Sequence, residues 1–155
     1  MTSRRGFLAL ASAFAAPAAV AQLPPNIAAM RQAALEAAIR KATGGAELRS
    51  GRVKLDLPPL IDNGNAVPLS VEVDSPMSAA DHVKAIHVFT ERTPQPYVLT
   101  AHLGPRAGRA QVTTRARIAD SGRVVAIAGM SDGTFWSETV SVVVILSACL
   151  EEGLI

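Results

Sequence analysis

VPLSVEV, at residues 67–73, carries the clearest structural signal in this chain. Its valine and leucine side chains at positions 67, 69, 71 and 73 alternate with Pro68, Ser70 and Glu72. Successive side chains of a strand point to opposite faces of a sheet, so this alternation predicts a half-buried β-strand.

The same two-residue period continues on both sides of this strand. Before it, residues 53–57 alternate, Pro58-Pro59 interrupts the pattern, and Asp62-Asn63-Gly64-Asn65 predicts a turn. After it, strands are predicted at 83–91, 97–103, 110–118, 124–130 and 134–146. About seven short strands without helices between them predict an all-β fold, an immunoglobulin-like antiparallel β-sandwich.

One helix is predicted ahead of the strands. Asn26 is a suitable N-cap, and Thr43-Gly44-Gly45 ends the helix. Apolar residues recur at three- and four-residue spacing, giving a face of Ile27, Met30, Ala34, Leu35, Ala38 and Ile39. We expect this face to pack on the sheet; binding to a partner is the alternative.

Residues 1–21 have the pattern of a twin-arginine export signal. Arg4-Arg5 precedes an apolar stretch of about fourteen residues, which is shorter than a membrane span, and small residues precede Gln22. We expect cleavage before Gln22 and a periplasmic location; a retained anchor is the alternative. Residues 22–146 then form the sandwich domain with its helix, and residues 147–155 form a C-terminal arm.

The charge of the mature chain gives no support for nucleic-acid or membrane binding. The full chain has 15 Lys and Arg against 13 Asp and Glu, and Arg4 and Arg5 leave with the signal. The formal net charge is then zero, and no basic run interleaved with aromatics remains. The mature length suits one domain whose core needs neither disulfides nor a metal.

No catalytic, metal-binding or cofactor-binding pattern is evident. His82 and His87 are five residues apart and point to opposite faces of an extended strand, whereas His102 lies on the next predicted strand and could neighbour His87. Two histidines without a third ligand make a weak metal site. No nucleophile motif or glycine-rich phosphate loop is present. We therefore expect a protein that is not an enzyme and has no cofactor.

Three surfaces have a simple structural interpretation. Phe135 and Trp136 are expected in the core or at a sheet edge. Arg115 and Arg117 lie on a polar strand face that solvent or a partner covers. Residues 140–146 are almost all apolar, which predicts burial on both faces, the second by another subunit.

Cys149 is the single cysteine and lies six residues from the end of the chain. In an oxidising compartment it has no partner within the chain, so it is either a buried apolar residue or a working thiol. Its position near a free terminus favours presentation to other molecules.

The mature chain resembles the SoxY family of bacterial sulfur oxidation. The resemblance rests on the twin-arginine signal, on residues 62–77, 84–96 and 131–144, and on the cysteine-bearing tail. It implies an immunoglobulin-like sandwich that pairs with a second sandwich protein of the SoxZ type. It also implies that Cys149 carries sulfur intermediates as covalent adducts, which a c-type cytochrome loads and a di-manganese hydrolase and other enzymes process.

The arm differs from the Gly-Gly-Cys-Gly-Gly end of typical SoxY proteins. Ser147-Ala148-Cys149-Leu150-Glu151 is more similar to the related group whose arm reads Ala-Ala-Cys-Ile-Glu. Without glycines the arm is stiffer. The acidic Glu151 and Glu152 disfavour the thiolate, so partner enzymes would have to activate the thiol. The resemblance therefore implies the fold but does not identify thiosulfate as the cargo.

Two functions remain. The first is a periplasmic covalent carrier with its cargo on Cys149. The second is a non-carrier interaction subunit in which Cys149 is structural or forms an intermolecular disulfide, since free cysteines are often buried.

Overall fold

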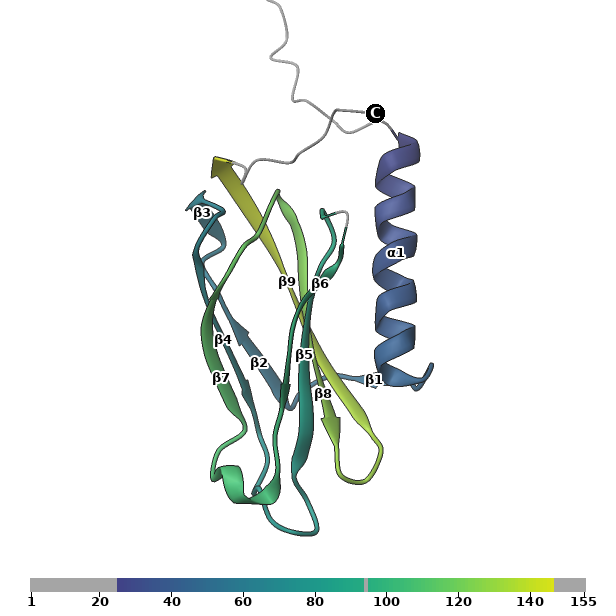
Figure 1. Cartoon of the computed structure of the whole chain (residues 1–155), viewed down its shortest axis with the longest axis vertical. Coiled ribbons are helices and arrows are strands. Elements are labelled where there is room, and N and C mark those ends of the chain that lie inside the picture. The colour runs from purple at the N-terminus through teal and green to yellow at the C-terminus, as the bar shows by residue number, and fades with distance from the viewer. Residues whose placement is uncertain (1–24, 94, 147–155) are drawn as a thin grey trace, which may run out of the picture.

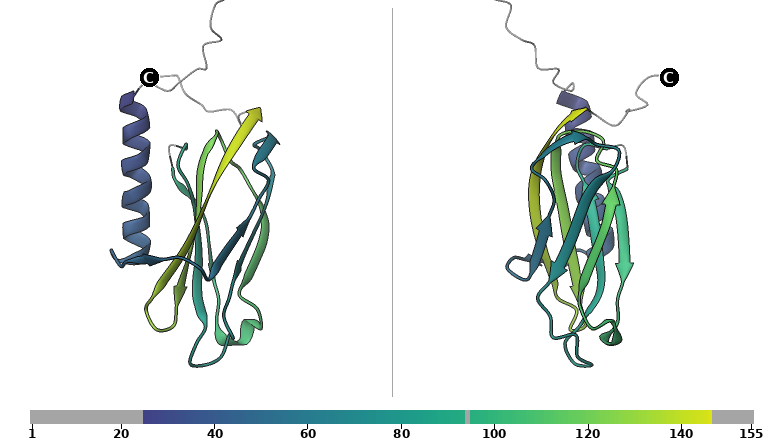
Figure 2. Two further views of the ribbon diagram at one scale, coloured as in Figure 1. Left: turned by 180° about the vertical axis from the view of Figure 1, so that it is seen from behind. Right: turned by 90° about the vertical axis from the view of Figure 1, so that its left-hand side faces the viewer.

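The computed structural model describes residues 25–93 and 95–146. In these residues nine strands form two facing sheets, and α1 (Pro25–Thr43) stands beside them (Figures 1 and 2). The predicted all-β sandwich with one preceding helix is confirmed. Neither α1 nor the short 3-10 helix η1 (Pro105–Ala107) has the length and apolar character that a membrane crossing requires.

The strands divide unequally between the two sheets. The larger sheet has the order β1 (Leu48–Arg49), β9 (Phe135–Leu146), β8 (Gly122–Met130), β5 (Val83–Thr90) and β6 (Tyr97–His102). Beyond this order, β3 (Leu60–Asn63) also pairs with β9. The smaller sheet has the order β2 (Val53–Asp56), β4 (Val67–Val73) and β7 (Gln111–Ala116).

β4 covers the residues that the alternating pattern predicted. It is antiparallel to β2, with Val71 opposite Leu55, and antiparallel to β7, with Val71 opposite Val112. Its four aliphatic side chains at alternate positions are at most 4% exposed. Each such side chain contributes roughly 1.5–3 kcal/mol on burial. The alternation therefore fixes which face of this strand joins the core.

Two apolar clusters stabilise the domain. The main one lies between the sheets and includes Leu69, Ile86 and Val124. The second lies between the larger sheet and α1, where Leu35 packs with Phe89, Val125 and Ile127. β8 is buried from Val124 to Met130 because one of its faces meets the main core and the other meets α1.

The predicted packing of the helix on the sheet is confirmed, but one part of its predicted face was wrong. Leu35, Ala38 and Ile39 belong to the cluster on the sheet. Met30 is 70% exposed, whereas Arg31 is 7% exposed. At 100° per residue, Met30 lies about 140° around the helix from Leu35, so the two cannot face the same sheet.

Two short strands were not predicted. β1 and β3 both pair with β9 in parallel, with Leu48 opposite Phe135 and Leu60 opposite Val143. β3 includes Asp62 and Asn63, which the sequence assigned to a turn. The turn itself is shorter and follows β3. With β1 and β3, the described residues contain nine strands, where about seven were expected.

Candidate functional site

The last strand, β9, leads directly into the segment that contains Cys149. The described residues end at Leu146, so Ser147, Ala148, Cys149, Leu150 and Glu151 lie outside them. The site that the structure does define is therefore the root of this segment, at the end of β9.

Hydrogen bonds fasten one edge of this root to the turn after β3. Asn63 is opposite Leu146 in the parallel β3–β9 ladder. The Gly64 N–H donates to the Leu146 carbonyl at 3.2 Å, and the Gly64 carbonyl accepts from the Ile118 N–H at 2.8 Å. Gly64 thus joins the end of β9 to the loop that follows β7.

The other edge of the root is held by Ser121. Its hydroxyl accepts from the Val144 N–H at 2.9 Å and donates to the Val144 carbonyl at 3.4 Å. Ser121 precedes β8, so its side chain continues the β8–β9 pairing past the last ladder pair, Gly122 with Val142. β9 is therefore held on both edges close to its end.

The sequence did not single out Gly64 or Ser121 for this role. Both lie in turn-forming stretches, Asp62-Asn63-Gly64 and Asp120-Ser121-Gly122, whose residues indicate a turn but not what that turn contacts. Gly64 and Ser121 lie in two turns that are distant in sequence and meet at the end of β9. Only the tertiary structure shows this meeting.

An apolar stripe covers the outer surface of the root. Leu60, Val143 and Ile145 share the outer face, and Leu146 ends the strand in phase with the core-facing residues; all four are 56–63% exposed and form what we call the arm-root stripe. The alternate residues Val142 and Val144 are 3% and 7% exposed and face the core. The prediction that residues 140–146 are buried on both faces was therefore wrong within the single chain, because its outer face is uncovered.

A bidentate ion pair lies at the same end of the sandwich. Glu91, just after β5, accepts hydrogen bonds from Arg123 at 3.0 Å to each carboxylate oxygen. These bonds lower the pKa of Glu91 and raise that of Arg123. The Arg123 guanidinium thus holds the Glu91 carboxylate in its ionised form.

Two of the three histidines lie near each other in the described part of the chain, and the third lies apart. His87 Nδ1 is 2.7 Å from the Thr100 hydroxyl, and burial, followed by the charge of His102, lowers the pKa of His87. His87 and His102 are thus near each other, as the sequence indicated. His82 lies before β5, with Nδ1 3.0 Å from the Ser78 carbonyl. Within residues 25–93 and 95–146, no three potential ligands gather around one point.

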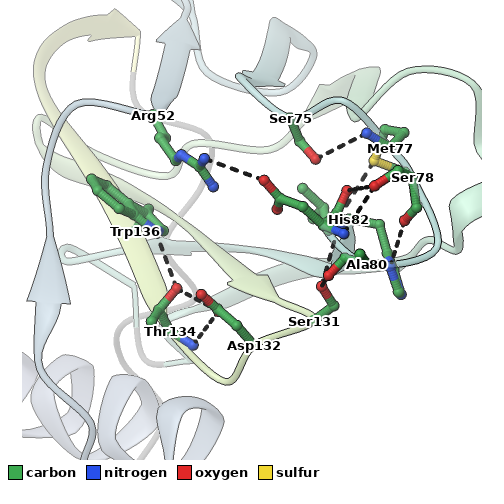
Figure 3. A network of polar contacts seen from close by, with 12 residues as sticks. Arg52, Ser75, Met77, Ser78, Ala80, His82, Ser131, Asp132, Thr134 and Trp136 are labelled. Carbon is green, nitrogen blue, oxygen red and sulfur yellow. Dashed lines mark hydrogen bonds and ion pairs between the residues drawn. The ribbon is translucent and has the colours of Figure 1, made fainter.

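The opposite end of the sandwich contains a network of polar contacts (Figure 3). The Asp132 carboxylate accepts from the Thr134 N–H at 2.8 Å and from its hydroxyl at 2.7 Å. Ser131 joins the same hairpin to the loop before β5, accepting from the His82 N–H at 3.1 Å and donating to the Ala80 carbonyl at 3.0 Å.

Arg52 and Trp136 complete this network. The Arg52 guanidinium lies 5.4 Å from the centre of the Trp136 ring and 3.4 Å from the Asp81 carboxylate (Figure 3). Trp136 also packs against the main core, and Phe135 packs on the helix side, as expected for both. These contacts hold loops together far from the arm root, so we assign them a structural role.

Arg115 and Arg117 lie on the exposed face at the end of β7, as the sequence predicted. Their neighbour Thr113 shares a hydrogen bond with Ser70 across the β4–β7 ladder, at 3.0 Å between the two hydroxyl oxygens. The two arginines also line a cleft, described below.

Among solved structures, the chain is similar to the sulfur carrier protein SoxY from Chlorobium limicola f. thiosulfatophilum, with 22% identity and a TM-score of 0.62. The match covers 74% of this chain and 95% of that one.

Superoxide reductases have a similar fold. The neelaredoxin from Ignicoccus hospitalis matches with 18% identity and a TM-score of 0.55, over 61% of this chain and 80% of that one. The enzyme from Nanoarchaeum equitans matches with 10% identity and a TM-score of 0.52, over 62% and 100%. At these identities the likeness shows the fold alone.

No curated protein sequence matches the chain. The family model for the sulfur oxidation protein SoxY, however, matches residues 39–149. That range covers most of the sandwich, the arm root and Cys149 itself. The chain therefore belongs to the SoxY family.

Proposed function

We propose that this protein is a covalent carrier of sulfur intermediates, with the cargo attached to the Cys149 thiol. The observation that carries the proposal is the extent of the family match, which runs from the helix through β9 to Cys149. The arm root supports it, because β9 is held on both edges immediately before the cysteine-bearing segment. A rigid domain with one terminal thiol suits the presentation of cargo to other proteins.

The carrier itself does not turn over in this proposal. Joining a thiolate to a sulfane sulfur such as that of thiosulfate forms an S–S bond and releases two electrons, so an oxidant has to accept them. We assign that role to a periplasmic c-type cytochrome, and removal of the cargo to Sox-type hydrolytic and oxidative enzymes. The twin-arginine signal at residues 1–21 supports the periplasmic location, where such partners and an unpaired thiol coexist.

The test is the intact mass of the protein purified from its native periplasm, before and after reduction. We expect a fraction with added sulfur atoms or a sulfonate on Cys149, and we expect reduction to restore the mass of the unmodified chain. A thiol that is always unmodified and resists alkylation would contradict the carrier and favour the structural alternative.

We further propose that a SoxZ-like sandwich protein covers the arm-root stripe. Three large apolar side chains exposed on one face of the β3–β9 pair, Leu60, Val143 and Ile145, are typical of an interaction site, and exposed Leu146 adjoins them at the end of β9. A subunit seated there would lie beside the segment with Cys149, where it could take part in presenting the cargo.

A charge placed in the stripe is expected to break this complex. Ile145→Glu would bury a carboxylate against the partner, so we expect the affinity to fall by about ten-fold or more in a co-purification or binding assay. Thr139→Glu is the matched control, because Thr139 is exposed on the same strand outside the stripe. Equal binding by both variants would show that the partner docks elsewhere.

A further inference from the structure

A cleft lies between the edge strands of the two sheets, β6 of the larger and β7 of the smaller. Its volume is about 350 Å³. We call it the β6–β7 cleft, and its lining includes Thr90, Tyr97, Leu99, Thr114, Arg115 and Arg117.

Cationic and hydroxyl groups dominate the polar lining of the β6–β7 cleft. Its lining includes two arginines, Arg115 and Arg117, and the hydroxyl-bearing Thr90 and Thr114. None of the described residues that line it is acidic. Glu91 adjoins Thr90 in sequence, but its carboxylate is held by Arg123. Guanidinium and hydroxyl donors on a partly apolar floor are the groups that bind small oxyanions.

Hydrogen bonds hold described backbone on both walls of the cleft. The Thr90 N–H donates to the Pro96 carbonyl at 2.8 Å, which closes the connection between β5 and β6, and Thr90 is 2% exposed. On the other wall, Arg115 is opposite Pro68 and Ala116 is opposite Val67 in the β4–β7 ladder. A preformed site costs little ordering entropy when a ligand binds.

The cleft and the arm root lie at the same end of the sandwich. β6 begins, β7 ends and β9 ends at this end (Figure 1). We propose that the β6–β7 cleft binds a small sulfur oxyanion, either free sulfate or the terminal sulfonate of a cargo. Sulfate and a sulfonate present the same array of oxygens on sulfur; the choice of sulfur rests on the proposed carrier function.

Sulfate titrated into the ¹⁵N-labelled mature protein tests the site directly. At constant ionic strength, maintained with chloride, we expect saturable shifts of the Thr90 and Thr114 amide signals. In the Arg115→Gln/Arg117→Gln variant we expect the sulfate affinity to fall by about five-fold or more, because two charge-assisted donors are lost.

The Arg106→Gln/Arg109→Gln variant is the matched control. These arginines are exposed and do not line the cleft, so the variant removes the same charge from the β6–β7 connection. We expect its sulfate affinity to stay within about two-fold of the parent, because surface charges at a distance are screened by salt. Far-UV circular dichroism checks folding, and Arg115→Gln alone replaces the double variant if that variant does not fold.

A second titration distinguishes the two sources of the anion. Tetrathionate loads the protein without another oxidant: the Cys149 thiolate attacks an inner sulfur, forms Cys–S–S–SO₃⁻ and releases thiosulfate. If the cargo sulfonate occupies the cleft, the loaded protein binds sulfate more weakly than a Cys149→Ser variant treated identically. If only free sulfate is the ligand, the two bind it equally.

Either result in the second titration supports the cleft. The absence of saturable shifts, or equal weakening by the two double-arginine variants, would overturn it. The first titration uses unloaded protein, whereas the carrier function is tested by the mass of native Cys149 adducts. A result that contradicts anion binding in the cleft can therefore be distinguished from one that contradicts the carrier function.

Discussion

Replacing Cys149 by serine is expected to remove every sulfur adduct from the protein and to stop oxidation of its sulfur substrate in the host. The chain contains no second cysteine that could take over attachment. A serine hydroxyl is far less acidic than a thiol and forms no S–S bond, so no residual carrier activity should remain. Intact mass after tetrathionate treatment measures loading, and the rate of sulfur-compound oxidation by the variant strain measures function.

Ser147→Ala is the matched control for this substitution. It changes a side chain two residues before the thiol and leaves the sulfur in place, so we expect loading to remain. An adduct on the Cys149→Ser protein would show attachment at another group. Unchanged sulfur oxidation by the Cys149→Ser strain would instead support the interaction-subunit alternative.

The strands were predictable wherever one face of a strand is buried and the other is exposed to solvent. Residues 67–73 show this most directly, because each core-facing valine or leucine is flanked by a residue that faces outward. The ends of β5 and β6 were also close to the prediction, at Thr90 and His102 where 91 and 103 were expected, although β5 is buried along most of its length.

Features that depend on distant pairing could not be predicted in the same way. β3 lies in parallel beside β9, about eighty residues later in the chain, and its four residues carry no local strand pattern. The apolar run at the end of β9 was visible in the sequence. Which of its side chains, such as Val143 and Val144, face outward depends on where β3 and β8 bind that strand.

The candidate site was only partly readable from the sequence. Cys149 could be singled out by composition and by its place near the end of the chain, and it stays a prediction outside the described residues. The hydrogen bonds that hold the end of β9 could not be predicted, because Gly64 and Ser121 reach β9 from two separate turns. Arg115, Arg117 and Thr90 likewise line one cleft only because two sheet edges face each other.

Gly64→Ala is expected to destabilise the domain at the arm root. A Cβ atom on Gly64 would clash with the Ile118 carbonyl oxygen and lie 3.2 Å from Val144 Cγ1. The first contact is with backbone, so the turn has to move away. The movement weakens the bonds from Gly64 to Leu146 and from Ile118 to Gly64. Overpacking together with two weakened hydrogen bonds predicts a loss of about 2–4 kcal/mol in the free energy of unfolding.

Gly104→Ala separates this effect from the general cost of replacing glycine. Gly104 has an extended backbone, and an added Cβ there meets nothing within 4 Å. We expect its effect on stability to stay within about 0.5 kcal/mol, because it removes no contact and reduces the freedom of the unfolded chain. Urea denaturation of both variants makes the comparison. Similar midpoints would mean that the turn after β3 yields easily, and that Gly64 does not determine how the root of the Cys149 segment is held.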